Sequence, residues 1–372
     1  MYVFLIQYEY ILTSYIAFST VVCKIIAIRD VESNHSLKGV NYMKEGHLPV
    51  LQVSGKNLPQ AFEQALIAVW DQGVSMATHY DKEDGNPSKE AMVTVILEEP
   101  FGEPRIPKAI IGGPEELEVY RQEVVEGIHD KWVDDNPETS VWPYSYHERL
   151  FAYPVRDEKG KIQRVNQFDT ILRMLAKDIT NKRAEAITWR PAYDPNSTKS
   201  APCFQRMWFR AIPAGGEYVL NMHTYWRSRD LFKAWPMNVY GFTDLQRVFA
   251  EQLSEMIGKP VSLGRYVDTS DSLHIYGDDW ERAAREVAKI KASPDGCMTE
   301  ERTYRTDEPT VQMIFNETRR ILLADPMYQK KPFSDRPMAM GEDKVRLPDG
   351  TELDYRDGAL FTPDGKKYTP AG

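Results

Sequence analysis

The decisive stretch of the chain runs from Ala201-Pro202-Cys203 through Trp226-Arg227-Ser228-Arg229-Asp230 and Pro236-Met237-Asn238 to His274-Ile275-Tyr276. A Pro-Cys pair alone would predict nothing. The order and spacing of the four segments are informative because they combine a thiol, an arginine-serine pair, an amide and a His-x-Tyr pair. Together these groups suit a phosphorylated nucleotide held beside a nucleophilic cysteine.

Length and composition narrow the class of protein. The 372 residues allow one large domain or two medium ones, and 42% hydrophobic and 27% charged residues are typical of a soluble globular protein. The net charge of -9 argues against a nucleic-acid partner, which normally needs a basic face. The 3 cysteines are widely separated, so we expect no disulfide framework, no zinc ribbon and a reducing cytoplasm.

The N-terminal end is unusually apolar. Residues 1–42 form an extension whose longest apolar stretch, 11–23, is shorter than the roughly 20 residues of a membrane span. The basic segment that opens a secretory signal is missing. Two interpretations stay open: a membrane anchor, or an upstream extension ahead of a start at Met43.

The rest of the chain reads as one catalytic domain, 43–325, followed by an appended tail, 326–372. Two Pro-Asp-Gly turns in the tail predict two small hairpins. Within the domain, apolar periodicity predicts helices at 114–132 and 243–257, and an extended segment at 267–276. Helices alternating with strands indicate an α/β class.

The four segments resemble the thymidylate synthase family, over roughly residues 49–290 and most strongly over 181–276. The resemblance implies an α/β (α+β) fold, a mixed sheet with surrounding helices, and a homodimer paired sheet to sheet. It also implies a cytoplasmic C1 transferase of nucleotide biosynthesis that uses 5,10-methylenetetrahydrofolate and no metal. The expected reaction is one-carbon transfer to C5 of a uracil nucleotide, with dUMP to dTMP favoured.

Cys203 is the expected nucleophile, adding to C6 of the pyrimidine. A thiol needs to ionise, and a nearby arginine such as Arg227 favours that. The family resemblance assigns the nucleotide phosphate to Arg227-Ser228. It assigns a further paired-arginine segment, which reaches across to the partner subunit, to Lys182-Arg183, where Arg183 is the better match.

The base and sugar have their own candidates. The amide of Asn238 can donate to O4 and accept from N3-H of uracil, whereas related deoxycytidylate hydroxymethylases carry an acid here. Asp230 resembles the aspartate that lies against the base. His274 and Tyr276 alternate along an extended segment, so both can face the 3'-hydroxyl that this pair binds in the family.

Acid-base work requires a further group. The family uses a glutamate on the helix that corresponds to 114–132, and both Glu123 and Glu126 fit, with Glu123 slightly favoured. Tyr146, or less readily Tyr144, matches the active-site tyrosine of the family.

Departures from the family pattern keep alternatives open. Phe204 follows the nucleophile where the family commonly has His, Trp226 replaces Gln, and Ala234 replaces Gly. The family's short C-terminal segment closes over the ligands, and this tail does not resemble it. If water reaches the exocyclic methylene, the enzyme is a 5-hydroxymethylase of dUMP or, less readily, of a cytosine nucleotide. A non-catalytic nucleotide-binding homologue is the third possibility.

Overall fold

The computed structural model describes residues 45–82, 85–133, 140, 142–294, 296, 300–324, 338–339, 344–347, 349–356 and 359–368. The chain divides into two compact units, Met1–His47 and Leu48–Gly372, and the following account concerns the second. The apolar extension at 1–42 lies outside the described residues, as do Cys23 and Cys297.

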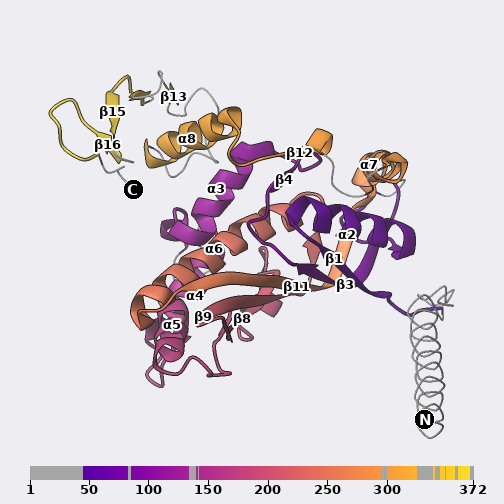
Figure 1. Cartoon of the computed structure of the whole chain (residues 1–372), viewed down its shortest axis with the longest axis horizontal. Coiled ribbons are helices and arrows are strands. Elements are labelled where there is room, and N and C mark those ends of the chain that lie inside the picture. The colour runs from indigo at the N-terminus through magenta and orange to yellow at the C-terminus, as the bar shows by residue number, and fades with distance from the viewer. Residues whose placement is uncertain are drawn as a thin grey trace, which may run out of the picture. The chain divides into compact units, whose positions relative to one another are not determined.

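A mixed sheet forms the centre of the unit (Figure 1). Its 8 strands follow the order β1-β3-β11-β9-β8-β7, with β2 paired to β3 and β10 to β11. β11 runs parallel to β9 and antiparallel to β3, whereas β8 and β9 form an antiparallel hairpin. The strand bounds are β1 Val50–Gly55, β2 Val74–Met76, β3 Ser88–Leu97, β7 Glu185–Ile187, β8 Phe204–Ala214, β9 Glu217–Trp226, β10 Arg229–Asp230 and β11 Val261–Ile275. The expected mixed sheet is therefore confirmed.

The two faces of the sheet differ in side-chain burial. Phe204, Met207 and Phe209 of β8 are fully buried, because successive side chains of a strand point to opposite faces. The alternate residues of the same strand, Arg206 and Trp208, are exposed or half-buried. One face therefore carries the core, and the other presents long polar and aromatic side chains.

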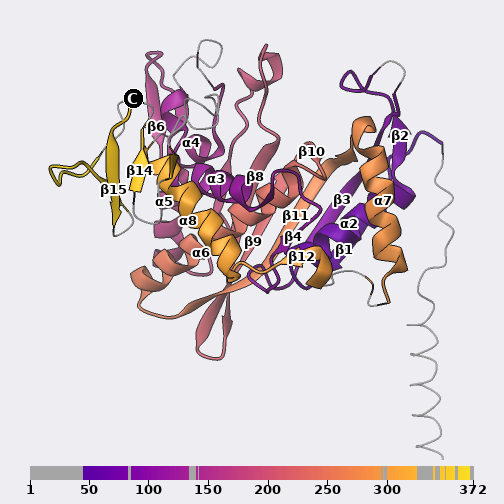
Figure 2. The same cartoon turned by 90° about the horizontal axis from the view of Figure 1, so that it is seen from above.

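Helices cover the core face, and Figures 1 and 2 show α2 and α6 lying along the sheet. α3 and α5 pack on α6, and α7 packs on α2. The helix bounds are α2 Leu58–Gln72, α3 Gly113–Glu126, α4 Tyr146–Phe151, α5 Gln167–Lys177, α6 Ala234–Ile257, α7 Trp280–Ala292 and α8 Pro309–Ala324. None of the helices within the described ranges is both long and apolar enough to cross a membrane.

Two helix boundaries differ from the sequence-based expectation. The helix predicted at 114–132 ends at Glu126, because Gly127 adopts a left-handed conformation with φ of 64°. A short 3-10 turn, Asp130–Trp132, follows it. The helix predicted from Thr243 begins earlier, at Ala234, so Asn238 lies within a helix and not in a turn.

Small strands complete the unit. The tail folds into an antiparallel sheet in the order β13-β14-β15-β16, and its strands contact α8. Asp349-Gly350 stands in the β14–β15 turn, and Gly365 closes a second turn onto Thr362. The bounds are β4 Ile106–Pro107, β5 Tyr153–Arg156, β6 Ile162–Val165, β12 Thr303–Tyr304, β13 Met338–Ala339, β14 Lys344–Arg346, β15 Glu352–Arg356 and β16 Ala359–Phe361.

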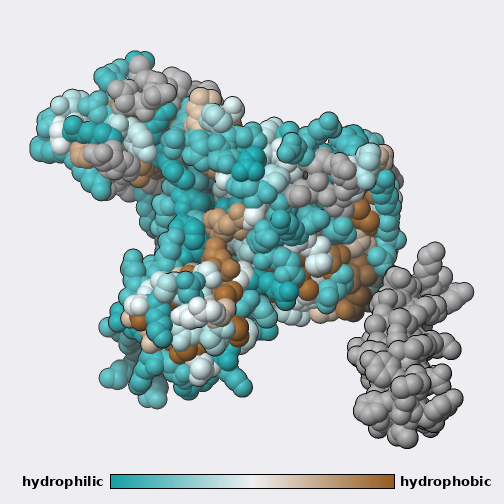
Figure 3. Space-filling view, viewed as in Figure 1, coloured by the Kyte–Doolittle hydropathy of each residue, from teal (hydrophilic) through white to brown (hydrophobic). Residues whose placement is uncertain are grey.

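The outer surface is mostly hydrophilic on the face seen in Figure 3, with apolar side chains gathered in limited areas. Exposed apolar residues include Leu48 and Val50 at the start of β1. Apolar areas of this kind are usual on globular proteins, so they carry no functional assignment by themselves.

Candidate active site

Cys203 lies half-buried at the end of the loop that leads into β8. Arg227, in the connection between β9 and β10, fastens this loop. Its backbone N–H donates to the Cys203 carbonyl oxygen at 2.9 Å. Its Nε and Nη2 donate to the carbonyl oxygens of Pro202 and Ala201, each at 2.9 Å. Arg227 therefore fixes the loop that carries the thiol, while Nη1 is left for an anionic ligand.

Two tyrosines reach the same loop from the start of α4. The Tyr144 hydroxyl donates to the Ala201 carbonyl oxygen at 3.3 Å, and the Tyr146 hydroxyl accepts from the Phe204 N–H at 3.4 Å. Burial, and after it the neighbouring Cys203, raise the pKa of Tyr144 to about 12. Burial also raises the pKa of Tyr146 well above its ordinary value. Both phenols are therefore neutral hydrogen-bond donors at pH 7.

α3 and α6 place an amide, a phenol and a carboxylate together. Buried Asn238 donates from Nδ2 to the Tyr120 hydroxyl at 2.5 Å. Burial, and next the charge of Glu123, raise the pKa of Tyr120 well above its ordinary value. Glu123 shares the face of α3 with Tyr120 because the two are three residues apart, and its Oε2 lies 3.3 Å from Nδ1 of buried His129.

The structure separates the two candidate glutamates. Glu123 lines a cavity of about 250 Å³ together with Trp142, Pro143, Tyr144, Tyr146 and Ser200. Glu126 is exposed, accepts from Arg121 Nη2 at 2.8 Å, and lines a different cavity. Only Glu123 is therefore placed beside the tyrosines that reach the Cys203 loop.

Asp230, His274 and Tyr276 form a second side of the site. Asp230 Oδ1 accepts from the backbone N–H of Phe232 at 2.8 Å, so it also shapes the turn before α6. The rings of His274 and Tyr276 have centroids 4.5 Å apart. Burial lowers the pKa of His274, and its Nε2 is buried without a hydrogen-bond partner. Burial, followed by Asp230, raises the pKa of Tyr276 to about 12, with Cys203 among the further contributors.

A carboxylate ties the loop before β3 to this side of the site. Asp81 accepts from the Gly277 N–H at 3.2 Å and from the Ser88 hydroxyl at 2.9 Å. Burial opposes ionisation, but hydrogen bonds from Thr78 and Ser88 outweigh it and lower the pKa of Asp81 to about 2. A Cβ at Gly277 would lie 1.8 Å from the Asn86 carbonyl oxygen, so only glycine permits this approach. The loop is therefore locked next to Tyr276.

Arg183 and Lys182 lie elsewhere. Both precede β7, and the β7–β8 register places Arg183 level with Arg210. Cys203 is seven residues further along, which corresponds to roughly 24 Å at a strand rise of about 3.4 Å per residue. Neither side chain can reach the Cys203 loop of its own subunit. Ser228, in contrast, directly follows Arg227 and is half-buried beside it.

Three residues of the site were missed in the sequence. Tyr120 could have been found from its i,i+3 spacing to Glu123. His129 and Asp81 carry no local signal, because their roles depend on the turn at Gly127 and on contact with Gly277 across the fold. Among the residues that the structure describes, no three histidine, cysteine, aspartate or glutamate side chains gather as metal ligands.

Comparison with known proteins decides the family. The sequence model described as thymidylate synthase matches residues 110–317, more than half of the chain. The chain belongs to the thymidylate synthase family.

Several relatives agree with this membership. A Methanosarcina mazei protein that is provisionally named a thymidylate synthase is 28% identical over 239 residues, which cover 64% of this chain and 95% of the relative. A Methanocaldococcus jannaschii protein with the same provisional name is 28% identical over 233 residues, 62% of this chain and 92% of the relative. The thymidylate synthase of Buchnera aphidicola is 20% identical over 165 residues, 43% of this chain and 58% of that protein.

Among solved structures, thermostable thymidylate synthase A from Bacillus subtilis aligns with a TM-score of 0.45 and 16% identity. The alignment covers 62% of this chain and 84% of the Bacillus chain. Thymidylate synthases bind a nucleotide and a folate and use methylenetetrahydrofolate.

Proposed function

We propose that this thymidylate synthase-family protein transfers a one-carbon unit to C5 of dUMP, through a covalent adduct between Cys203 and C6. The observation that carries the proposal is the shared loop around Cys203. Arg227, Tyr144 and Tyr146 each hydrogen-bond to this loop. A thiol, a guanidinium that can donate hydrogen bonds to a phosphate, and two neutral phenols therefore lie close together.

The first step uses the thiolate of Cys203. Its sulfur attacks C6, and the electron pair of the C5–C6 double bond moves toward O4 to give an enolate. Nη1 of Arg227 and the hydroxyl of Ser228 would bind the phosphate and hold C6 in line with the sulfur. Asp230, His274 and Tyr276 would hold the base and the sugar.

Uracil is favoured by the amide of Asn238. Because one N–H of this amide donates to the Tyr120 hydroxyl, its other N–H is free for O4 and its oxygen for N3-H. Tyr120 remains protonated, since burial raises its pKa, so it fixes the amide without adding charge.

Glu123 would act in the proton transfers at O4 and C5. It lines the cavity next to Tyr146, and His129 fixes its carboxylate. Removal of the C5 proton is required before the one-carbon unit can become a methyl group. Tyr146 would donate a hydrogen bond on the C5 side.

Methylenetetrahydrofolate would supply the one-carbon unit and, for a methyl product, a hydride. The cavity beside Glu123 fits a planar ring, because Trp142, Pro143 and Tyr144 give it an aromatic and apolar wall. We include in the proposal a cytoplasmic location and a homodimer in which Arg183, and less directly Lys182, bind the phosphate of the partner's site.

The tail favours 5-hydroxymethylation as a second candidate. In the family a short C-terminal segment closes over the ligands. Here the strands β13 to β16 form a separate antiparallel sheet that contacts α8. A site that is less completely closed would admit water to the exocyclic methylene.

Mass spectrometry of the products from dUMP and methylenetetrahydrofolate tests the proposal, with wild type beside Cys203→Ala. We expect a methylated nucleotide and dihydrofolate, both absent with the variant. A hydroxymethylated nucleotide would establish the second candidate instead. The absence of any C5-substituted product from dUMP would contradict both.

A further inference from the structure

A cavity of about 550 Å³ lies between α3, α6, α8 and the tail. We refer to it as the outer cavity. It is separated from the active site by α3 and α6 themselves. Arg121 and Glu126 of α3 line it, whereas Tyr120 and Glu123 lie on the active-site face of the same helix.

Arg105 is the distinctive residue of the outer cavity, because it is only 4% exposed. Its Nε donates to the Pro100 carbonyl oxygen at 3.2 Å, and its Nη2 donates to the Thr243 hydroxyl at 2.8 Å. The guanidinium lies 3.8 Å from the ring centroid of Phe101 and 4.2 Å from that of Tyr240. Arg105 is thus held rigidly, but only by neutral groups.

Arg105 forms no direct ion pair with a described residue, although the charges of Asp244 and Glu103 act on it from further away. Within the described residues, no carboxylate lies at ion-pair distance from it, and its Nη1 has no hydrogen-bond partner. Burial lowers the pKa of Arg105, since its charge has left water. A buried charge without a direct ion-pair partner is costly, and an anion bound at Nη1 would relieve part of that cost.

The other arginines of the outer cavity are already paired. Arg121 contacts Glu118 at 2.8 Å and Asp244 at 3.2 Å, and Arg319 contacts the same Glu118 at 2.7 Å. They form a fixed rim around Arg105. Half-buried Tyr355 adds aromatic surface on the tail side, while Phe315 of α8 is buried against Tyr240.

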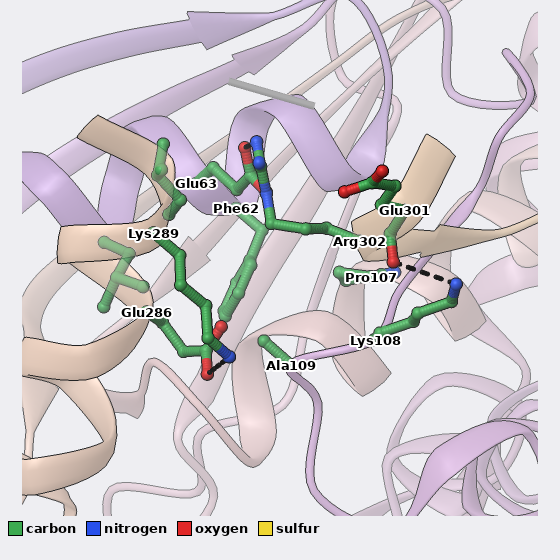
Figure 4. Close-up of a pocket in the computed structure, with 11 residues that line it drawn as sticks. Phe62, Glu63, Pro107, Lys108, Ala109, Glu286, Lys289, Glu301 and Arg302 are labelled. Atoms are coloured by element: carbon green, nitrogen blue, oxygen red, sulfur yellow. Dashed lines mark hydrogen bonds and ion pairs between the residues drawn. The ribbon is translucent and has the colours of Figure 1, made fainter. Parts of the chain in front are cut away.

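A second cavity in the same unit differs from the outer cavity in that its cations have partners. It measures about 230 Å³ and lies between α2, α7 and the loop around Lys108 (Figure 4). There Lys289 pairs with Glu286 at 2.9 Å, Arg302 pairs with Glu63 at 2.8 Å, and Lys108 donates to the Glu301 carbonyl oxygen at 2.9 Å. Every cation drawn in that cavity has a partner, so it offers no comparable anion site.

We propose that the outer cavity binds a nucleotide, with a phosphate at Arg105 Nη1 and the base against the aromatic side chains. Arginine suits phosphate oxygens because its nitrogens form a planar fork, and a base stacks on aromatic rings. The cavity is in the size range of small-molecule sites. This site is distinct from the substrate site at Cys203 and does not rest on the function proposed above.

Thermal unfolding of the full chain tests the proposal, with ATP, dTTP and pyrophosphate as probes. The background variant is Arg227→Ala, which weakens phosphate binding at the Cys203 site. We expect at least one of the two nucleotides to raise the Tm of this variant by a few degrees and pyrophosphate to raise it less. Adding Arg105→Met should abolish the shift, whereas adding Arg173→Ala, an exposed arginine of α5, should preserve it.

A second variant, at the edge of the outer cavity, tests the site even if Arg105→Met fails to fold. Gln312 is exposed at the edge of the outer cavity, and Gln312→Trp would fill the space without removing a buried contact. We expect it to weaken nucleotide binding at least about tenfold. The proposal is overturned if neither nucleotide shifts the Tm, if pyrophosphate alone gives the full shift, or if the shift survives Gln312→Trp.

Discussion

At the residue scale, most hydroxyl and imidazole groups around Cys203 are held neutral. Burial raises the pKa of Tyr120, Tyr144 and Tyr146 and lowers that of His274. The charged side chains beside the Cys203 loop are then few, and Arg227 and Glu123 are the ones to which we assign different roles. Such separation would let the carboxylate that we propose for proton transfer act without competition from its neighbours.

Two glutamates of α3 provide a matched pair for mutation. We expect Glu123→Gln to lower kcat by about 10²–10⁴-fold, the usual contribution of a general acid or base. Glu126→Gln should leave kcat nearly unchanged, because Glu126 is exposed, pairs with Arg121 and does not line the cavity beside the Cys203 loop. Steady-state kinetics of both variants checks this, and an equal loss in both would contradict the assignment of Glu123.

His274 should make stability depend on pH. Its folded-state pKa lies below the unfolded value of 6.5 because of burial. The folded protein therefore resists protonation that the unfolded chain accepts, so the stabilisation is present above pH 6.5 and is lost as pH falls below it. We expect urea unfolding at pH 7.5 and 5.5 to show a larger loss of stability on acidification in wild type than in His274→Asn. Equal losses would show that His274 is not the group responsible.

The residues found from the sequence share a local pattern. Cys203 and the Arg227-Ser228 pair stand in short motifs whose order is visible in one dimension. His129 could not be found this way, because it meets Glu123 only after the chain turns at Gly127. Asp81 likewise acts on Gly277, far along the sequence.

At the scale of elements, β10 is a short strand that contains Asp230 and directly follows the Arg227-Ser228 pair. Arg229 of β10 pairs with Asp268 of β11 at 3.1 Å, and both side chains are only 1% exposed. Arg229 also stacks on Trp226 at 3.8 Å. The unusual Trp226 is therefore part of the support beneath Arg227 and Asp230.

Breaking this buried pair should be strongly destabilising. We expect Asp268→Asn to cost about 3–5 kcal/mol, because it leaves Arg229 buried without a counter-ion. The exposed pair of Asp169 and Arg173 is the control, and Asp169→Asn should cost no more than about 1 kcal/mol. Urea unfolding compares them, and similar losses would mean that the buried pair is not the support we describe.

Element boundaries were harder to predict than element types. The helix after Pro114 was recognised by its acidic first turn and apolar spacing. The end of this helix could not be predicted, because the residues around Gly127 give no sign that it adopts a left-handed conformation. The early start of α6 was missed because Pro236 and Asn238 suggest a turn, whereas packing against the sheet makes them helical.

At the scale of the whole molecule, the sheet presents a second surface with long side chains. Arg206 and Trp208 of β8 lie on it beside His223 and Tyr225 of β9, all of them exposed or half-buried. Arg183 stands at the far end of this surface, roughly 24 Å from Cys203 by the strand rise. A phosphate held by both Arg183 and Arg227 therefore requires a second copy of the chain. The sequence could suggest this only through the family resemblance.

Mixing two inactive variants tests whether the site is shared. If Arg183 acts across a two-fold dimer, Arg183→Ala and Cys203→Ala damage different halves of each site. Random exchange of subunits would make half of the dimers mixed, each with one complete site, so activity should return to about a quarter of wild type. Cys203→Ala mixed with Arg227→Ala is the matched control, because the two residues contact each other's segments within one subunit and no complete site can form. Recovery in neither mixture, with subunit exchange verified by mass, would show that Arg183 does not act across the dimer, and full activity of Arg183→Ala before mixing would place Arg183 outside the active site.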